Sequence, residues 1–273
     1  MRLARLLAVI PAALAAVPAA AQVAPPEPLN CVIEPRTLAR VGSPDQGIIA
    51  EIKVERGDVV AAGQVLAVLD ARIEQLTANL TGLQAGTDVE VRANRARAAY
   101  QRIAAQRARE LNERKVMSDK NRDEALVEAE IAKLDVEAAE TRQAVATAEY
   151  ELAKARLDRR TIRSPIDGVV TEIRMAPGEF VHEQAPLLTV ARIDELHVEV
   201  FVPIQNYGAI RLGQRATVQP VEPVGGRYPA SVVAVDKVFD AASGTFGVRL
   251  RMTNPDLALP AGIRCKVGFA PGS

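Results

Sequence analysis

The chain of 273 residues is 48% hydrophobic, and its 34 basic residues balance its 34 acidic residues, a composition that suits one large domain or two to three small ones. The balanced charge argues against nucleic acid as a partner, because neutralising phosphates requires a net basic surface. Aromatic residues make up only 3% and tryptophan is absent, so neither a stacking platform for bases nor a deep aromatic ligand pocket is well supplied.

The first residues are typical of a secretory signal peptide. Arg2 and Arg5 precede an apolar run over residues 6–16, and alanines at 19–21 supply the small-residue pattern that a signal peptidase accepts. The alternative is a membrane anchor, but the run is shorter than the roughly 20 apolar residues that cross a bilayer. We therefore predict a cleaved signal peptide over residues 1–21, a periplasmic mature protein, and an N-terminal segment over residues 22–42.

Two stretches of the mature chain are nearly the same. "SPDQGIIAEIKVERGDVV" begins at Ser43 and "SPIDGVVTEIRMAPGEFV" begins at Ser164, so equivalent positions are separated by a constant 121 residues. Both stretches alternate apolar and polar residues and turn at a glycine, which indicates short strands about a tight turn. Because a half-sheet of this size is marginal alone, we expect residues 43–70 and 161–193 to pack together as one β domain.

Residues 71–160, between the two copies, contain no proline and many alanines. Apolar residues recur there at helical spacing: Leu76, Leu80, Leu83, Tyr100, Ile103, Leu111, Leu126, Ala129, Val136, Ala139 and Leu152. The break falls in "KVMSDKN", where Ser118 or Asp119 can cap a second helix. The pattern predicts an antiparallel hairpin of two helices of roughly 40 residues each, on the order of 60 Å long.

The charges of the two predicted helices are complementary. Basic residues dominate from 92 to 115 and acidic residues from 119 to 151, so folding the hairpin lays opposite charges side by side. Exposed ion pairs contribute little stability, so this pattern favours one pairing direction. Gly82 and Gly86 each weaken the first helix by up to about 1 kcal/mol relative to alanine, which makes this stretch the expected place for a bend or fraying.

Residues 194–273 contain several short alternating segments separated by Gly, Pro and Asn turns, among them "LHVEVFVP", "YPASVVAVDKVFD" and "GTFGVRLRMTNPD". Such segments predict a small antiparallel β-barrel or sandwich. The predicted fold class is therefore α+β, with a split β domain, an inserted helical hairpin and a trailing barrel.

This arrangement resembles the HlyD-type periplasmic adaptors, also called membrane fusion proteins. The resemblance rests on the halves "GIIAEIKVERGDVVAAGQVLAVLD" and "RSPIDGVVTEIRMAPGEFVHEQAPLLTVA", the hairpin between them, and the ending "TNPDLALPAGIRCKV". It implies a split lipoyl-like domain and a non-enzymatic, homo-oligomeric adaptor between an inner-membrane efflux transporter and an outer-membrane channel. An RND-type transporter is favoured over an ABC-type exporter.

The hairpin tip carries the most specific element of this resemblance. Adaptors that dock on TolC-type channels have an Arg, a Leu four residues later and a Ser seven further, and "RARELNERKVMS" supplies Arg107, Leu111 and Ser118 at that spacing. Asp123 and Ala125 continue the pattern. The resemblance implies a channel-binding tip. The alternative is that Leu111 is coiled-coil core, Arg107 a solvated charge and Ser118 only a helix cap.

The sequence departs from many such adaptors in offering only about 20 mature residues before Ser43 and ending just after the barrel. We therefore expect no membrane-proximal domain, which leaves the mode of attachment at the inner membrane open. The alternative functions are a periplasmic coiled-coil scaffold or regulator without a conduit role, and an adaptor of an ABC-type exporter.

No catalytic, cofactor or metal site is predicted. Carrier lipoyl domains present a modifiable lysine on the exposed turn, but here the hairpin occupies that turn and no lysine flanks it at residues 70–71 or 160–161. His182 and His197 have no neighbouring nucleophile motif, and the methionines are scattered.

Cys31 and Cys265 are the only cysteines of the chain. An exported protein meets an oxidising compartment in which a disulfide can persist, so a bond between Cys31 and Cys265 is one hypothesis. The alternative is two buried free thiols, because the sequence gives no distance between the residues.

Overall fold

In the computed structural model, residues 28–182 and 185–270 are described, so the predicted signal peptide lies outside the described residues. The chain divides into two compact units. The first, here called the barrel unit, comprises Met1–Val32, Val198–Arg251 and Ile263–Ser273. The second, here called the hairpin unit, comprises Ile33–His197 and Met252–Gly262. In the described residues, no helix has both the length and the hydropathy that crossing a membrane requires.

The two repeats of the hairpin unit interlock as one curled, lipoyl-like domain. Its strands are β2 (Gly47–Ile52), β3 (Val59–Val60), β4 (Val65–Leu69), β5 (Thr161–Arg163), β6 (Gly168–Ile173), β7 (Phe180–Val181) and the first part of β8 (Pro186–Pro203). One sheet has the order β5-β4-β2-β7, and β3, β6 and β8 are neighbours in the other sheet. Strand β3 of the first repeat therefore pairs with β6 of the second, and β7 of the second repeat pairs with β2 of the first.

The strand register is symmetric between the copies. Gly47 pairs with Val181, and Gly168 pairs with Val60. Gly168 is the repeat counterpart of Gly47, and Val60 is the counterpart of Val181, so each copy makes the same contact with the other. The positive φ angles of Gly57 (100°) and Gly178 (90°) form the two equivalent turns, where a side chain would be strained. The prediction that the copies form one domain is confirmed.

The core of this domain is supplied by both copies. Leu66 and its counterpart Leu187 are both fully buried in one apolar cluster. Its other buried members are Val41, Ile49, Val54, Val60, Ala67, Leu69, Ile162, Val170, Val181, Leu188 and Val190. Neither half encloses this core alone. The hairpin is therefore inserted into a domain whose core depends on both halves.

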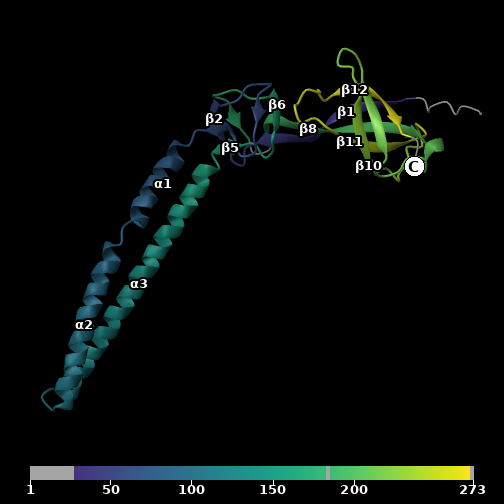
Figure 1. The fold of residues 1–273 in the computed structure, drawn as a ribbon. Helices are drawn as coiled ribbons and strands as arrows, with labels where there is room; N and C mark the ends of the chain where they lie inside the picture. The colour runs from purple at the N-terminus through teal and green to yellow at the C-terminus, as the bar shows by residue number, and fades with distance from the viewer. Residues whose placement is uncertain (1–27, 183–184, 271–273) are drawn as a thin grey trace, which may run out of the picture. The chain divides into compact units, whose positions relative to one another are not determined.

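The inserted residues form three helices (Figure 1), where the sequence predicted two: α1 (Arg72–Ala85), α2 (Val89–Glu113) and α3 (Asp119–Asp158). The expectation of two helices of roughly 40 residues is correct only for α3, which has 40 residues. The ascending arm is interrupted at Gly86, the C-cap residue that follows α1. The side chain of Gln143 on α3 donates to the carbonyl of Ala85 and satisfies one of the acceptors that the interruption frees.

The helices meet through alanine, whereas the sequence periodicity had emphasised large apolar residues. The buried helix residues are Ala78, Val91, Ala105, Ala108, Ala132, Ala139 and Ala153. Leu76, Leu80 and Leu83 are 58–74% exposed, and Leu152 is 53% exposed. The line of contact between the helices is here called the seam. Small residues in the seam let the two backbones approach closely, and the larger apolar side chains lie outside it. The hairpin thus keeps an apolar outer surface.

The barrel unit is a six-stranded barrel with the order β1-β12-β9-β10-β11-β8, and an additional β1–β8 pairing closes it. Its strands are β1 (Leu29–Gly42), β8, β9 (Arg215–Pro220), β10 (Tyr228–Val235), β11 (Thr245–Thr253) and β12 (Ile263–Phe269), and β1, β8 and β11 also have residues in the hairpin unit. Residues 22–42 were predicted only as an N-terminal segment, without a strand. β1 is therefore an addition to the predicted barrel.

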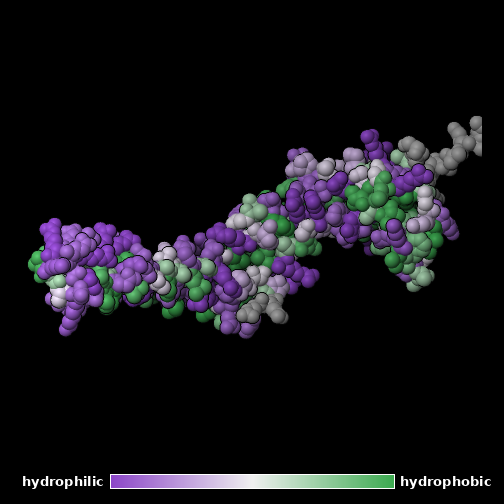
Figure 2. Space-filling view, turned by 90° about the horizontal axis from the view of Figure 1, so that it is seen from below, coloured by the Kyte–Doolittle hydropathy of each residue, from purple (hydrophilic) through white to green (hydrophobic). Residues whose placement is uncertain are grey.

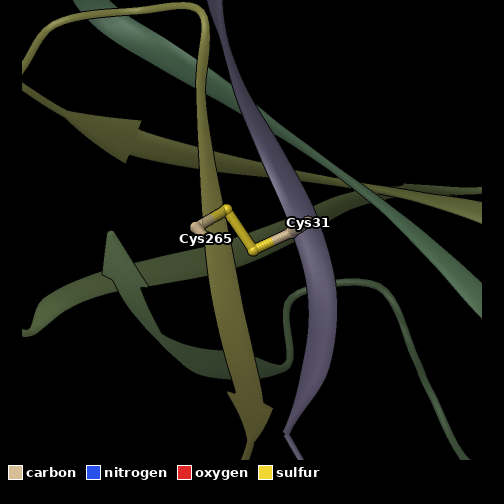
Figure 3. The surroundings of a disulfide bond; sticks show 2 residues. All are labelled: Cys31 and Cys265. Atoms are coloured by element: carbon tan, nitrogen blue, oxygen red, sulfur yellow. A yellow bond between two sulfur atoms is a disulfide. The ribbon is translucent and has the colours of Figure 1, made fainter. Parts of the chain in front are cut away.

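Cys31 on β1 and Cys265 on β12 form a disulfide between adjacent strands (Figure 3). Their Cα atoms are 4.9 Å apart and their positions differ by 234 residues. Both side chains are buried. The bond joins the first described strand of the chain to the last.

Candidate functional site: the hairpin tip

The tip is the turn over residues 114–118, between the end of α2 and the start of α3. Backbone bonds close it: the amide of Lys115 donates to Asn112 (2.8 Å) and the amide of Val116 to Leu111 (2.9 Å). Lys115 has a φ of 57°, a conformation that residues other than glycine adopt at a cost on the order of 1 kcal/mol. The turn projects Val116, which is 73% exposed.

A network of polar side chains holds the tip together. Asn112 donates from Nδ2 to the carbonyl of Met117 and to Oδ1 of Asp119, both at 3.0 Å. Arg122 donates from Nη1 to Oδ1 of Asn112 at 2.9 Å and to Oδ1 of Asp119 at 3.1 Å. Its bonds to Asp123 raise the pKa of the Arg122 guanidinium. The end of α2 is thereby clamped to the first turn of α3.

The three residues predicted at the tip lie close to this clamp. Arg107 is exposed on α2, and Leu111, one turn nearer the tip, is 38% exposed. Ser118 is the N-cap of α3, and its Oγ accepts from the amide of Asn121 at 3.3 Å. Ser118 therefore fits the capping interpretation. Leu111 is partly buried, and its role in channel binding stays a prediction.

A groove runs between α2 and α3 on the tip half of the hairpin, with a volume of about 1090 Å³. Arg107 lines it together with Arg102 and Glu110, and Ile103, Leu126 and Ala129 supply apolar surface. Basic and apolar groups thus lie side by side next to the tip. A partner helix seated here finds both hydrogen-bond donors and a surface to pack against.

The predicted charge pairing between the arms holds for the part of α2 farther from the tip. Arg95 pairs with Glu140 at 2.7 Å, and Arg97 lies 3.9 Å from Asp135. Within the described residues, the basic side chains nearer the tip that make no ion pair are Arg102, Arg107, Arg109, Arg114 and Lys115. These five cations remain available to a partner.

At the opposite end, two arginines fasten the hairpin to the lipoyl-like domain. Arg160 pairs with Glu74 at 2.6 Å and donates to the carbonyl of Gln46 at 2.8 Å, and both charged side chains are about 20% exposed or less. Arg159 pairs with Asp45 at 2.6 Å. A Cβ at Gly47 would lie 2.9 Å from Nη1 of Arg160, so glycine makes room for this contact. Both arms therefore begin at a fixed base.

The sequence pointed to residues at the tip. It did not predict the polar network of Asn112 and Arg122 at the tip, or the arginine contacts at the base of the hairpin. Arg107, Leu111 and Ser118 stand out through their spacing, whereas Asn112 and Arg122 are polar residues of the kind found on any exposed helix. A usable signal is the position of Asn112 at the end of one helix and of Asp119 at the start of the next, where unpaired backbone groups recruit such side chains.

Comparison with known proteins agrees with this architecture. Residues 37–192, more than half of the chain, match the family model described as CzcB-like, barrel-sandwich hybrid domain. ZneB from Cupriavidus metallidurans is 26% identical, with 92% of this chain and 100% of that chain covered and a TM-score of 0.52. MacA from Actinobacillus actinomycetemcomitans is 20% identical, with 90% and 78% covered and a TM-score of 0.70.

The periplasmic adaptor protein EmrA is also similar in fold, at 15% identity, with 89% and 97% covered and a TM-score of 0.52. The α+β architecture of a lipoyl-like domain, a helical hairpin and a six-stranded barrel is therefore that of the adaptor proteins. This chain belongs to the periplasmic adaptor, or membrane fusion protein, family of efflux systems, whose members are not enzymes.

Proposed function

We propose that this protein is the periplasmic adaptor subunit of a tripartite efflux transporter and that its hairpin tip docks on a TolC-type outer-membrane channel. Its other partner in this proposal is an inner-membrane pump, RND-type in preference to ABC-type. The observation that carries the proposal is the pairing of an exposed Arg107 and a partly exposed Leu111 with a turn that Asn112 and Arg122 hold in place. In this proposal the protein is exported to the periplasm by a cleaved signal peptide and lies peripheral to the inner membrane.

The tip chemistry suits docking against a helical partner. The guanidinium of Arg107 is free of ion pairs within the described chain and offers a fork of donors for carbonyl or carboxylate oxygens. Leu111 offers an apolar side chain for a groove in the partner, as in helix-in-groove recognition. Because the clamp fixes the turn before binding, less conformational entropy is lost on docking.

Several copies are required for the adaptor to form a conduit, because a single hairpin encloses no channel. The exposed Leu76, Leu80, Leu83 and Leu152 provide apolar surface for contacts between neighbouring hairpins. The adaptor then contributes geometry and sealing, and the transporter supplies the energy.

Replacing Arg107 by Asp or Leu111 by Ser is expected to reduce co-purification of the TolC-type channel by at least about tenfold, since hot-spot side chains contribute about 2 kcal/mol or more to binding. Efflux-dependent resistance should fall in parallel. The measurement is quantitative mass spectrometry of the channel on the tagged adaptor, isolated from cells after mild cross-linking.

Arg156→Asp and Leu38→Ser are the matched controls, because both residues are exposed and lie far from the tip in sequence and in the hairpin unit. Both controls should retain the channel. If Arg107→Asp and Leu111→Ser fold normally and retain the channel as well, the docking assignment is wrong and a scaffold without a conduit role becomes the better hypothesis. The inner-membrane protein recovered in the same experiment distinguishes RND-type from ABC-type partners.

A further inference from the structure

The barrel unit carries positive charge that it does not neutralise. Its described residues include eight cations and four acids, for a net charge of +4. The cations are Arg211, Arg215, Arg227, Lys237, Arg249, Arg251, Arg264 and Lys266, and the acids are Glu199, Glu222, Asp236 and Asp240. Arg249 pairs with Glu199, and the other seven cations have no ion pair within the described part of the chain. The unit therefore attracts anionic surfaces.

One end of the barrel also exposes apolar side chains. It is formed by two segments, residues 204–214 between β8 and β9 and residues 236–244 between β10 and β11, here called the loop end. Val238 is 85% exposed, Leu212 69%, Tyr207 49% and Phe239 40%. In the space-filling view, hydrophobic surface lies among hydrophilic residues over the barrel unit (Figure 2). Exposed apolar side chains that gather at one place are a feature of interaction sites.

The loop end is built to present these side chains. The ring of Tyr207 makes edge contacts with Phe239 (4.8 Å between centroids) and with the buried Phe246 (5.4 Å). The amide of Ile204 donates to the carbonyl of Gly244 at 3.0 Å and ties the two segments together. Val238 and Phe239 therefore project from a supported loop, which lowers the entropy lost on binding.

Cations lie on the same end. Lys237 precedes Val238 in the loop, and Arg211 precedes Leu212 in the other segment. The amide of Gly213 donates to Val232, near the end of β10, so this second segment lies beside the strand that leads into the 236–244 loop. Arg215, at the start of β9, pairs across the ladder with Ser231 of β10. Apolar side chains and cations thus lie at the same end of the barrel.

The two acids of the loop end form no ion pair with these cations in the described part of the chain. Asp240 accepts from the amide of Ala242 (2.9 Å) and from Oγ of Ser243 (2.8 Å), so its ionised carboxylate is held against its own loop. Asp236 lies against the backbone of β11, where its Oδ2 is 2.3 Å from the position a Cβ of Gly247 would take. Neither forms an ion pair with Arg211, Arg215 or Lys237.

We propose that the loop end of the barrel binds the surface of an anionic phospholipid bilayer. Val238 and Leu212 enter the interface, Tyr207 and Phe239 lie at the headgroup level, and Lys237, Arg211 and Arg215 contact the phosphates. Exposed apolar groups flanked by cations are the combination that binds anionic bilayers, and aromatic rings favour the same interface. The net charge of +4 on the barrel unit supports a partner surface of extended negative charge.

The test is co-sedimentation of the purified mature protein with vesicles of phosphatidylglycerol and phosphatidylethanolamine, compared with vesicles of phosphatidylcholine alone. Binding should rise with the phosphatidylglycerol content and fall as salt is added. The double variant Lys237→Glu/Arg211→Glu should lose at least about tenfold in partition coefficient on anionic vesicles, given the contribution of each cation near such a surface. Val238→Asp/Leu212→Asp should lose about tenfold or more, because charged residues replace inserted apolar ones.

The matched controls are Arg227→Glu and Val221→Asp, which change the same residue types in the segment between β9 and β10, outside the loop end. Both should bind more tightly than the loop-end variants, because they leave the loop end unchanged. Circular dichroism checks folding, and Val238 and Leu212 are exposed enough for substitution without loss of the core.

Absence of binding to anionic vesicles at low salt would overturn the proposal and would point to a protein as the occupant of this surface. Equal losses in the loop-end variants and in the controls would also overturn it. The result is independent of the hairpin tip, so failure here is distinguishable from failure of the docking proposal.

Discussion

Reduction of the Cys31–Cys265 disulfide is expected to lower the free energy of unfolding of the barrel unit by about 3–5 kcal/mol. The bond links strands whose residues are 234 positions apart, so its loss releases a long loop in the unfolded chain. For a domain of this size, such a loss lowers the melting temperature by more than about 10 °C. Differential scanning calorimetry with and without reductant measures the change.

The double variant Cys31→Ala/Cys265→Ala provides the control. It should melt near the temperature of the reduced wild type, and added reductant should leave its transition unchanged. If the reduced and oxidised wild-type proteins melt at the same temperature, then the link between β1 and β12 does not restrain the barrel. A low transition in the variant together with no effect of reductant on the wild type would indicate that packing of the buried side chains, and not the bond, is the cause.

Replacing either Leu66 or Leu187 by Ala is expected to reduce the stability of the lipoyl-like domain by about 3 kcal/mol, through lost burial and a cavity in the core. Both side chains are fully buried, and they occupy equivalent positions of the two repeats in one cluster. The two losses should therefore be similar, although the residues lie on opposite sides of the inserted hairpin in the sequence. Hydrogen exchange of the β4 and β8 amides, together with calorimetry, gives the comparison.

Val59 and its repeat counterpart Phe180 are suitable controls, because they are 65% and 49% exposed. Their replacement by Ala should change stability by only about 0.5 kcal/mol or less. A large loss for Leu66→Ala with almost none for Leu187→Ala would show that the halves do not share one core. It would also weaken the symmetric register as the explanation of the doubled sequence.

Much of the lipoyl-like domain could be predicted because its repeat is written in the sequence at a constant offset. Gly57 and Gly178 both lie at turns that need a positive φ. This requirement depends on the turn alone, so the sequence around each glycine is enough to predict it. The exchange of β3 and β7 between the halves was not predictable, because a two-residue strand has no pattern of its own. Strand β1 was missed for a related reason, since Pro35 breaks its alternation and its partner β12 lies at the other end of the chain.

The hairpin shows the limit of periodicity as a predictor of contacts. Regular spacing predicted helices, but alanines such as Ala105 and Ala132 form the seam while Leu76 and Leu83 remain exposed. Periodicity identifies an apolar stripe and does not say whether the intramolecular partner or another molecule covers it. At the tip, spacing pointed to Arg107, Leu111 and Ser118, whereas the clamp of Asn112 and Arg122 depends on side-chain geometry that only the folded turn defines.

The most direct test of the proposed role is photo-cross-linking from the tip in living cells. A photoreactive amino acid at Val116, which is 73% exposed on the turn, should form an adduct with a TolC-type outer-membrane channel. The same amino acid at Ile73, which is 71% exposed at the base of the hairpin, should form no channel adduct. We expect a channel adduct from Val116 and none from Ile73. Absence of that adduct in cells that express both proteins, or equal adducts from both positions, would contradict it.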